Sequence, residues 1–110
     1  MSLPAHELVF APGRHACSLQ AAASRVFGAL GIARPRLIEK TGPGQALDLY
    51  WEGRRDGVVC RVRGSDWDPR LPQTRLHIEL SRGAKAGAML QRLQGYAAEQ
   101  GWGSAEVADA

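Results

Sequence analysis

His77 and Glu79 are two residues apart, so their side chains share one face if this segment is a β-strand. An imidazole and a carboxylate side by side could transfer protons or, with His6 or His15 nearby, hold a metal ion. However, three histidines without a paired ligand motif do not define a metal site, and the chain has no CxxC pair and no GxSxG motif. The sequence therefore supports no catalytic residue, no metal site and no cofactor.

The charged side chains around this pair form a second candidate site. Residues 58–63 (VVCRVR) and 75–80 (RLHIEL) alternate apolar and charged residues with a period of two, as half-buried strands do. The apolar row, which includes Cys60, Val62 and Ile78, should face a core. With the same parity over residues 46–52, the other row is a charged sheet face of eight residues: Asp48, Tyr50, Glu52, Arg61, Arg63, Arg75, His77 and Glu79.

Two interpretations of the charged sheet face remain open. Its charges could be cross-strand pairs on a solvated sheet. Alternatively it could bind another protein, most simply a second copy of the chain, because Tyr and Arg are favoured at binding hot spots. The predicted interface residues are Tyr50, Arg61, Arg63, Arg75, His77 and Glu79.

A third candidate is an anion-binding site where a strand leads into a helix, at Ser81, Arg82, Gly83 and Lys85. Unpaired amides at a helix N-terminus attract anions, a small residue permits close approach, and two cations add charge. The glycine and lysine spacing matches neither a P-loop nor a dinucleotide-binding fingerprint. Ordinary capping of the helix is the alternative.

The elements that position these residues begin with a helix and an edge strand. Apolar residues recur at helical spacing over residues 18–30, with Ser18 as the expected N-cap and Gly31 as the stop. Residues 36–40 have imperfect alternation, which favours a strand at a sheet edge. The chain also allows short strands at residues 7–10 and 105–107.

Three further strands are predicted over residues 46–52, 58–63 and 75–80. Asp56-Gly57 is a hairpin signal that should pair the first two of them. The intervening segment 64–74 contains two prolines and is predicted to be a long loop, a type of segment that often forms contact surfaces.

The second helix is predicted to follow Ser81 as N-cap, with an apolar stripe from Ala84 to Ala97. Gly101 should end this helix, with Trp102 folding back on its last turn. The predicted fold is therefore a single α+β domain over residues 1–110, with the order (β)αββββα. Its four-stranded antiparallel sheet has two helices packed on one face.

The composition allows one ordinary globular domain and leans basic. The chain has 110 residues, of which 45% are hydrophobic and 23% charged, a formal net charge of +3 and a pI near 9.3. A basic balance favours an anionic partner without selecting nucleic acid. The arginines are spread along the chain, and GC-rich coding would also produce this bias toward Arg and Ala.

Cys17 and Cys60 are expected to be reduced, because no export signal precedes them. No apolar run approaches the length of a membrane span. The predicted location is the cytoplasm, without a membrane partner.

The segment from about Ser18 to Leu93 resembles the double-stranded RNA-binding domain in its order of helix, strands and helix. RLIEKTGPGQA is similar to the loop that joins the first two strands of that family, and SRGAKAGAML is similar to its second helix start. The resemblance implies RNA contacts at both places. Gln45 stands where histidine is usual, Gly83 separates Arg82 from Lys85, and residues 64–80 add a loop and a strand.

These observations predict a non-catalytic binding or adaptor module that associates with itself, or with another protein, through the charged sheet face. The alternative is a domain that binds RNA or another polyanion through Arg82, Lys85 and the row of Arg61 and Arg63.

Overall fold

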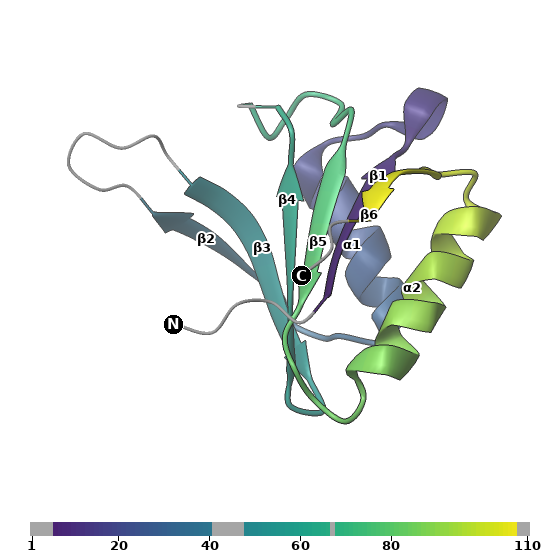
Figure 1. Ribbon diagram of the computed structural model, residues 1–110. Helices are drawn as coiled ribbons and strands as arrows, with labels where there is room; N and C mark the ends of the chain where they lie inside the picture. Colours follow the sequence, from purple (N-terminus) through teal and green to yellow (C-terminus); the bar gives the residue numbers. More distant parts are fainter. Residues whose placement is uncertain (1–5, 41–47, 67, 108–110) are drawn as a thin grey trace.

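The computed structural model describes residues 6–40, 48–66 and 68–107 (Figure 1). Strands and helices follow one another in the order β1-α1-β2-β3-β4-β5-α2-β6, with a short 3-10 helix η1 after β1. Their bounds are β1 His6–Ala11, η1 Gly13–His15, α1 Leu19–Leu30, β2 Arg36–Lys40, β3 Asp48–Arg55, β4 Val58–Gly64, β5 Leu76–Leu80, α2 Ala86–Glu99 and β6 Gly103–Val107.

The sheet has six strands in the order β2-β3-β4-β5-β1-β6, and every neighbouring pair is antiparallel. The mixed α+β class with an antiparallel sheet is thus confirmed, but the prediction of four strands was wrong. The two short strands that the sequence allowed at its ends extend the sheet, and β1 lies between β5 and β6. Such pairing joins the two ends of the chain, so it leaves no local signal in the sequence.

Helix α1 forms as its residues predict. The Ser18 side chain accepts a hydrogen bond from the amide of Ala21 at 3.3 Å, and Gly31 ends the helix with a left-handed φ of 70°. All six residues of the predicted apolar stripe are buried: Leu19, Ala22, Ala23, Val26, Phe27 and Leu30. The helix therefore offers one continuous apolar side to the sheet.

Helix α2 begins later than predicted. Its N-cap is Lys85, without a side-chain hydrogen bond, whereas Ser81 lies four residues earlier and bonds to a strand. The predicted stripe was therefore partly wrong, because Ala84 precedes the helix and Ala88 is exposed. The rest of the stripe faces the core: Met89, Leu93 and Ala97 are buried as predicted, Leu90 and Tyr96 are partly buried, and Ala86 is buried in addition.

The C-terminal end of α2 is confirmed. Gly101 has a φ of 75°, and the amide of Trp102 donates to the carbonyl of Ala97 at 2.9 Å. Trp102 then packs edge-on against Tyr96, with a ring-centroid distance of 5.7 Å. The predicted fold-back of Trp102 is therefore present.

The β3–β4 hairpin turns at Asp56-Gly57, as predicted. Both residues have positive φ, 51° for Asp56 and 77° for Gly57, which is the backbone geometry of a tight two-residue hairpin. The register pairs Arg55 with Val58 and Trp51 with Val62. This turn puts Arg54 and Arg55 at one end of the sheet.

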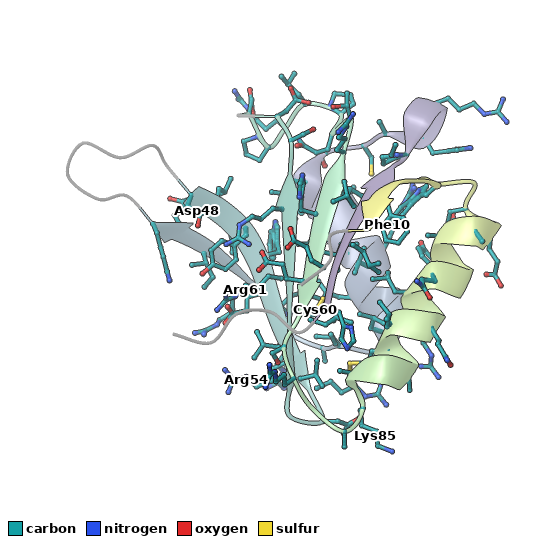
Figure 2. All side chains as sticks on the ribbon, in the orientation of Figure 1. Phe10, Asp48, Arg54, Cys60, Arg61 and Lys85 are labelled. Atoms are coloured by element: carbon teal, nitrogen blue, oxygen red, sulfur yellow. The ribbon has the colours of Figure 1, made fainter. Side chains whose placement is uncertain are left out.

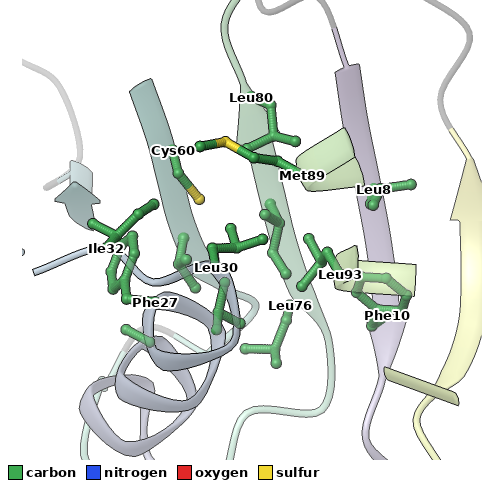
Figure 3. Packing of buried hydrophobic residues seen from close by; sticks show 14 of the residues in the cluster. Leu8, Phe10, Phe27, Leu30, Ile32, Cys60, Leu76, Leu80, Met89 and Leu93 are labelled. Carbon is green, nitrogen blue, oxygen red and sulfur yellow. The ribbon is translucent and has the colours of Figure 1, made fainter. Parts of the chain in front are cut away.

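The core lies between the sheet and both helices. Cys60, Val62 and Ile78 are each no more than 1% exposed, so the predicted parity of the central strands is confirmed. Figure 3 shows Cys60, Leu76 and Leu80 facing Phe27 and Leu30 of α1 and Met89 and Leu93 of α2. In the part of the chain that the structure describes, no helix covers the opposite face of the sheet (Figure 1).

The connection between β4 and β5 is organised around Gln73, a buried polar residue with no exposed surface. Its side-chain oxygen accepts from the amide of Asp66 at 3.0 Å, and its side-chain nitrogen donates to the carbonyls of Asp68 and Leu71. The amide of Leu19 also donates to the carbonyl of Pro69 at 2.8 Å, so this loop is tied to the start of α1. The long loop is confirmed, and it has a polar centre that the sequence analysis missed.

Candidate functional site

The charged sheet face lies on the side of the sheet away from the helices. The strand register aligns Glu52, Arg61 and Glu79 in one row across β3, β4 and β5. Arg63 lies opposite His77 in the adjacent row. Antiparallel pairing therefore brings the predicted acidic and basic residues into direct cross-strand contact.

Arg61 and Arg63 of this face are paired with carboxylates. The Arg61 Nε lies 2.9 Å from the Glu52 Oε2, and the Arg63 Nε lies 3.3 Å from the Asp48 Oδ1. Arg63 also forms an ion pair with Glu79 on β5. These pairs neutralise the row of arginines that the sequence offered to a polyanion.

Tyr50 is not displayed to solvent, so this part of the prediction was wrong. Its residue is only 2% exposed, although it lies on the charged sheet face. The Arg63 guanidinium carbon is 4.4 Å from the ring centroid, that of Arg61 is 5.4 Å away, and the Lys40 Nζ is 5.9 Å away. Long basic side chains cover the ring because cations are attracted to its π face.

The remaining predicted interface residues differ in exposure. His77 and Glu79 are half-buried, whereas Arg75 precedes β5 and is exposed. The Arg75 amide donates to the Ser65 hydroxyl oxygen at 3.0 Å, which ties the start of β5 to the end of β4. Among residues 6–40, 48–66 and 68–107, no group of three His, Cys, Asp or Glu side chains could hold a metal ion.

The predicted anion-binding residues divide into two structural residues and two exposed cations. Ser81 bonds to β4, with its hydroxyl oxygen accepting from the Val59 amide at 2.8 Å and its own amide donating to the Val59 carbonyl at 2.9 Å. A Cβ at Gly83 would lie 2.7 Å from the Val58 Cγ2, so this glycine is needed for packing. Arg82 and Lys85 are exposed and available to a ligand.

Arg82 and Lys85 belong to a larger cluster of cations at one end of the sheet. The α1–β2 connection, the β3–β4 turn and the β5–α2 connection all lie at this end, where β3 and β5 finish and β2 and β4 begin. Figure 2 shows Arg54 and Lys85 together there, away from Asp48. We define the basic end by six exposed residues: Arg34, Arg54, Arg55, Arg82, Lys85 and Arg92.

The basic end carries little negative charge. Asp56 lies in the same turn, and its Oδ2 is 3.5 Å from the Arg55 Nε. Within the described ranges, the five other cations of the basic end have no carboxylate partner within 4.0 Å. A cluster of this kind creates a positive potential that attracts anions.

Four members of this cluster were not predicted from the sequence: Arg34, Arg54, Arg55 and Arg92. They come from three segments, and each contains only one or two cations. The predicted hairpin and the order of strands could have placed Arg54 and Arg55 near Ser81. The position of α2 over the turn depends on tertiary packing, so Arg92 had no local signal.

Cys60 and Asp68 are the other groups with a distinctive chemistry. Burial raises the pKa of the Cys60 thiol to about 12, so this core cysteine stays protonated and unreactive at neutral pH. A side-chain hydrogen bond from Arg70 lowers the pKa of Asp68 below its usual value. Neither residue lies in the basic end, and both are explained by the fold.

Comparisons with known proteins do not identify a relative: no family model, no curated protein and no solved structure matches this chain. The glycine–proline part of the resemblance to the double-stranded RNA-binding domain falls on residues 41–47, which are outside the described residues. Within the described parts of the chain, neither helix combines the length and the apolar character needed to cross a bilayer. Functional inference therefore depends on the geometry of the two charged regions.

Proposed function

We propose that this protein is a non-catalytic binding module that holds the phosphate backbone of a nucleic acid at its basic end. The observation that carries the proposal is the gathering of six exposed cations at one end of the sheet, of which only Arg55 has an ion-pair partner among the described residues. Phosphate backbones are bound chiefly by such cations, with release of condensed counterions.

The mode of binding should be independent of base sequence. The six residues of the basic end are all Arg or Lys, and none offers an aromatic platform for base stacking. Arginine and lysine contacts to phosphate fix the position of a nucleic acid without reading its bases. Affinity should therefore vary little between sequences and decrease steeply with salt.

The test is a salt titration of binding to a labelled 20-nucleotide single strand and to the corresponding duplex. Replacing Arg82 and Lys85 together by Ala should weaken binding and reduce the slope of log K against log salt by about two. The matched control replaces Arg14 and Arg75, two exposed arginines at the opposite end of the sheet. Equal losses in both double variants, or no binding at low salt, would reject the proposal.

Self-association through the charged sheet face is the second candidate function. It is favoured by the alternation of cations and carboxylates, because two copies related by a two-fold axis could exchange these partners. Sizing at micromolar concentration should then give a dimer, and Arg63→Glu should disrupt it. A monomer at every salt concentration would exclude this candidate.

A further inference from the structure

A hollow lies within the basic end, where the C-terminus of α1, the β3–β4 turn and the start of α2 meet. Leu30 and Met89 are buried apolar residues in its lining. Arg55 and Asp56 contribute from the turn, and Lys85 and Arg92 contribute from α2. The hollow therefore combines an apolar surface with charged walls.

One cation of the hollow is held in place by the backbone. The Arg55 Nη1 donates to the carbonyl of Leu30 at 3.0 Å and to that of Gly31 at 3.1 Å. These bonds satisfy carbonyls at the end of α1 and orient the guanidinium before any ligand arrives. A ligand thus meets a charge that needs little reorganisation.

The other two cations are available to a ligand. Lys85 and Arg92 are exposed and have no ion-pair partner among the described residues. The first turn of α2 contains no acidic residue, and no side chain caps it. Asp56 is the carboxylate of the lining, and among the described residues its ion pair is with Arg55, so Lys85 and Arg92 are left for a ligand.

The charge of the lining selects among phosphate groups. Three cations and one carboxylate give the hollow two net positive charges. A phosphate monoester carries close to two negative charges at neutral pH, whereas an internal phosphodiester carries one. The monoester is the better electrostatic match, and its additional terminal oxygens can accept hydrogen bonds from Lys85 and Arg92.

We infer that this hollow binds a phosphate monoester, such as the terminal phosphate of a nucleic acid strand or of a mononucleotide. The inference rests on the proposed function, since it assigns the strand end to a particular part of the basic end. Lys85 and Arg92 bind the phosphate oxygens, Arg55 supplies fixed positive charge, and Leu30 and Met89 contact the attached nucleoside.

The experiment compares single strands of one sequence that differ only at their ends. The full chain is titrated with internally labelled 12-nucleotide strands carrying a 5′-phosphate, a 3′-phosphate or hydroxyl groups at both ends. At least one of the two phosphorylated strands should bind roughly tenfold more tightly than the strand with hydroxyl groups at both ends. This is the effect of about one additional charge-assisted hydrogen bond. Arg92→Ala should abolish this preference.

The matched control is Arg54→Ala, which removes an exposed cation of the basic end that does not line the hollow. It should weaken all three strands equally and leave the preference for a terminal phosphate intact. Because Arg92 and Arg54 are both exposed, thermal unfolding of the two variants should resemble that of the parent protein.

The outcomes separate this inference from the proposed function. Equal affinity for all three strands would overturn the phosphate-monoester site while leaving backbone binding in place. If no strand binds, calorimetry with adenosine monophosphate and with inorganic phosphate decides. Mononucleotide binding that Arg92→Ala abolishes would support the hollow and reject the polyanion function, whereas no heat with either compound would reject both.

Discussion

On the charged sheet face, Arg61 and Arg63 lie within ion-pair distance of Glu52, Asp48 and Glu79, whereas among the described residues only Arg55 of the basic end has a carboxylate partner, Asp56. Neighbouring strands fix the first set at cross-strand positions, so each charge meets a partner. The second set comes from two connections, the last residues of β3 and helix α2, and no strand pairing places a carboxylate opposite each of its members. The difference indicates that the charges of the sheet stabilise the fold, while those of the basic end are available to a ligand.

Replacing Arg55 should have the largest effect on stability. Arg55 belongs to the basic end, but its side chain is hydrogen-bonded to the backbone as a structural residue would be. Arg55→Ala removes two hydrogen bonds to the carbonyls of Leu30 and Gly31, and we expect a loss of about 1.5–2 kcal/mol in the free energy of unfolding. Urea denaturation measures this value. Arg54→Ala is the matched control and should change it by less than about 0.5 kcal/mol. Similar losses of stability in both variants would contradict the structural role of Arg55.

Arg63→Ala should have the next largest effect. This change removes the ion pairs with Asp48 and Glu79 and uncovers the ring of Tyr50, so we expect a loss of about 1 kcal/mol. Urea denaturation of Arg75→Ala, an exposed arginine without an ion pair among the described residues, provides the reference. An unchanged midpoint for Arg63→Ala would mean that the charges of this face do not stabilise the fold.

The Glu52–Arg61 pair should contribute less. A double-mutant cycle with Glu52→Ala and Arg61→Ala should give a coupling energy of about 0.5 kcal/mol in low salt. Because the pair is partly exposed, the coupling should decrease in 1 M NaCl, where the Debye length is about 3 Å. A coupling energy of zero in low salt would mean that Arg61 does not stabilise the fold through Glu52 and is available to a ligand.

Arg82→Ala combined with Lys85→Ala should have the smallest effect on stability. Both side chains are exposed, and neither forms an ion pair or a hydrogen bond among the described residues. We expect the free energy of unfolding to change by less than about 0.5 kcal/mol. Thermal and urea unfolding both report this value, and a loss above about 1 kcal/mol would show that these cations are structural.

Much of the fold could be predicted from local patterns. The helical stripe and the caps of α1 lie within a few residues of one another, and so do the Asp56-Gly57 turn and the alternation of β4 and β5. The start of α2 was misplaced because the hydroxyl of Ser81 bonds to Val59 on β4, a partner that is 22 residues away in the chain. A capping rule considers only neighbouring residues, so it does not include the Val59 amide as a partner for Ser81.

The candidate site was only partly predictable for the same reason. Arg82 and Lys85 are close in the sequence and were identified, but the hollow also needs Arg55 and Arg92, which other segments supply. Tyr50 was assigned to the correct face, yet its exposure depends on Arg63, whose guanidinium lies over its ring. The exposure of a side chain depends on its neighbours in space, so the alternation of residues along the strand could not predict it.

The sequence by itself determined the helix α1, the central strands and the side of the sheet on which the side chains of those strands lie, because these properties follow from repeats over a few residues. Only the tertiary structure decided that β1 and β6 complete the sheet and that some arginines meet carboxylates while others remain exposed. Both outcomes depend on contacts between distant segments, whose geometry exists only after the chain has folded.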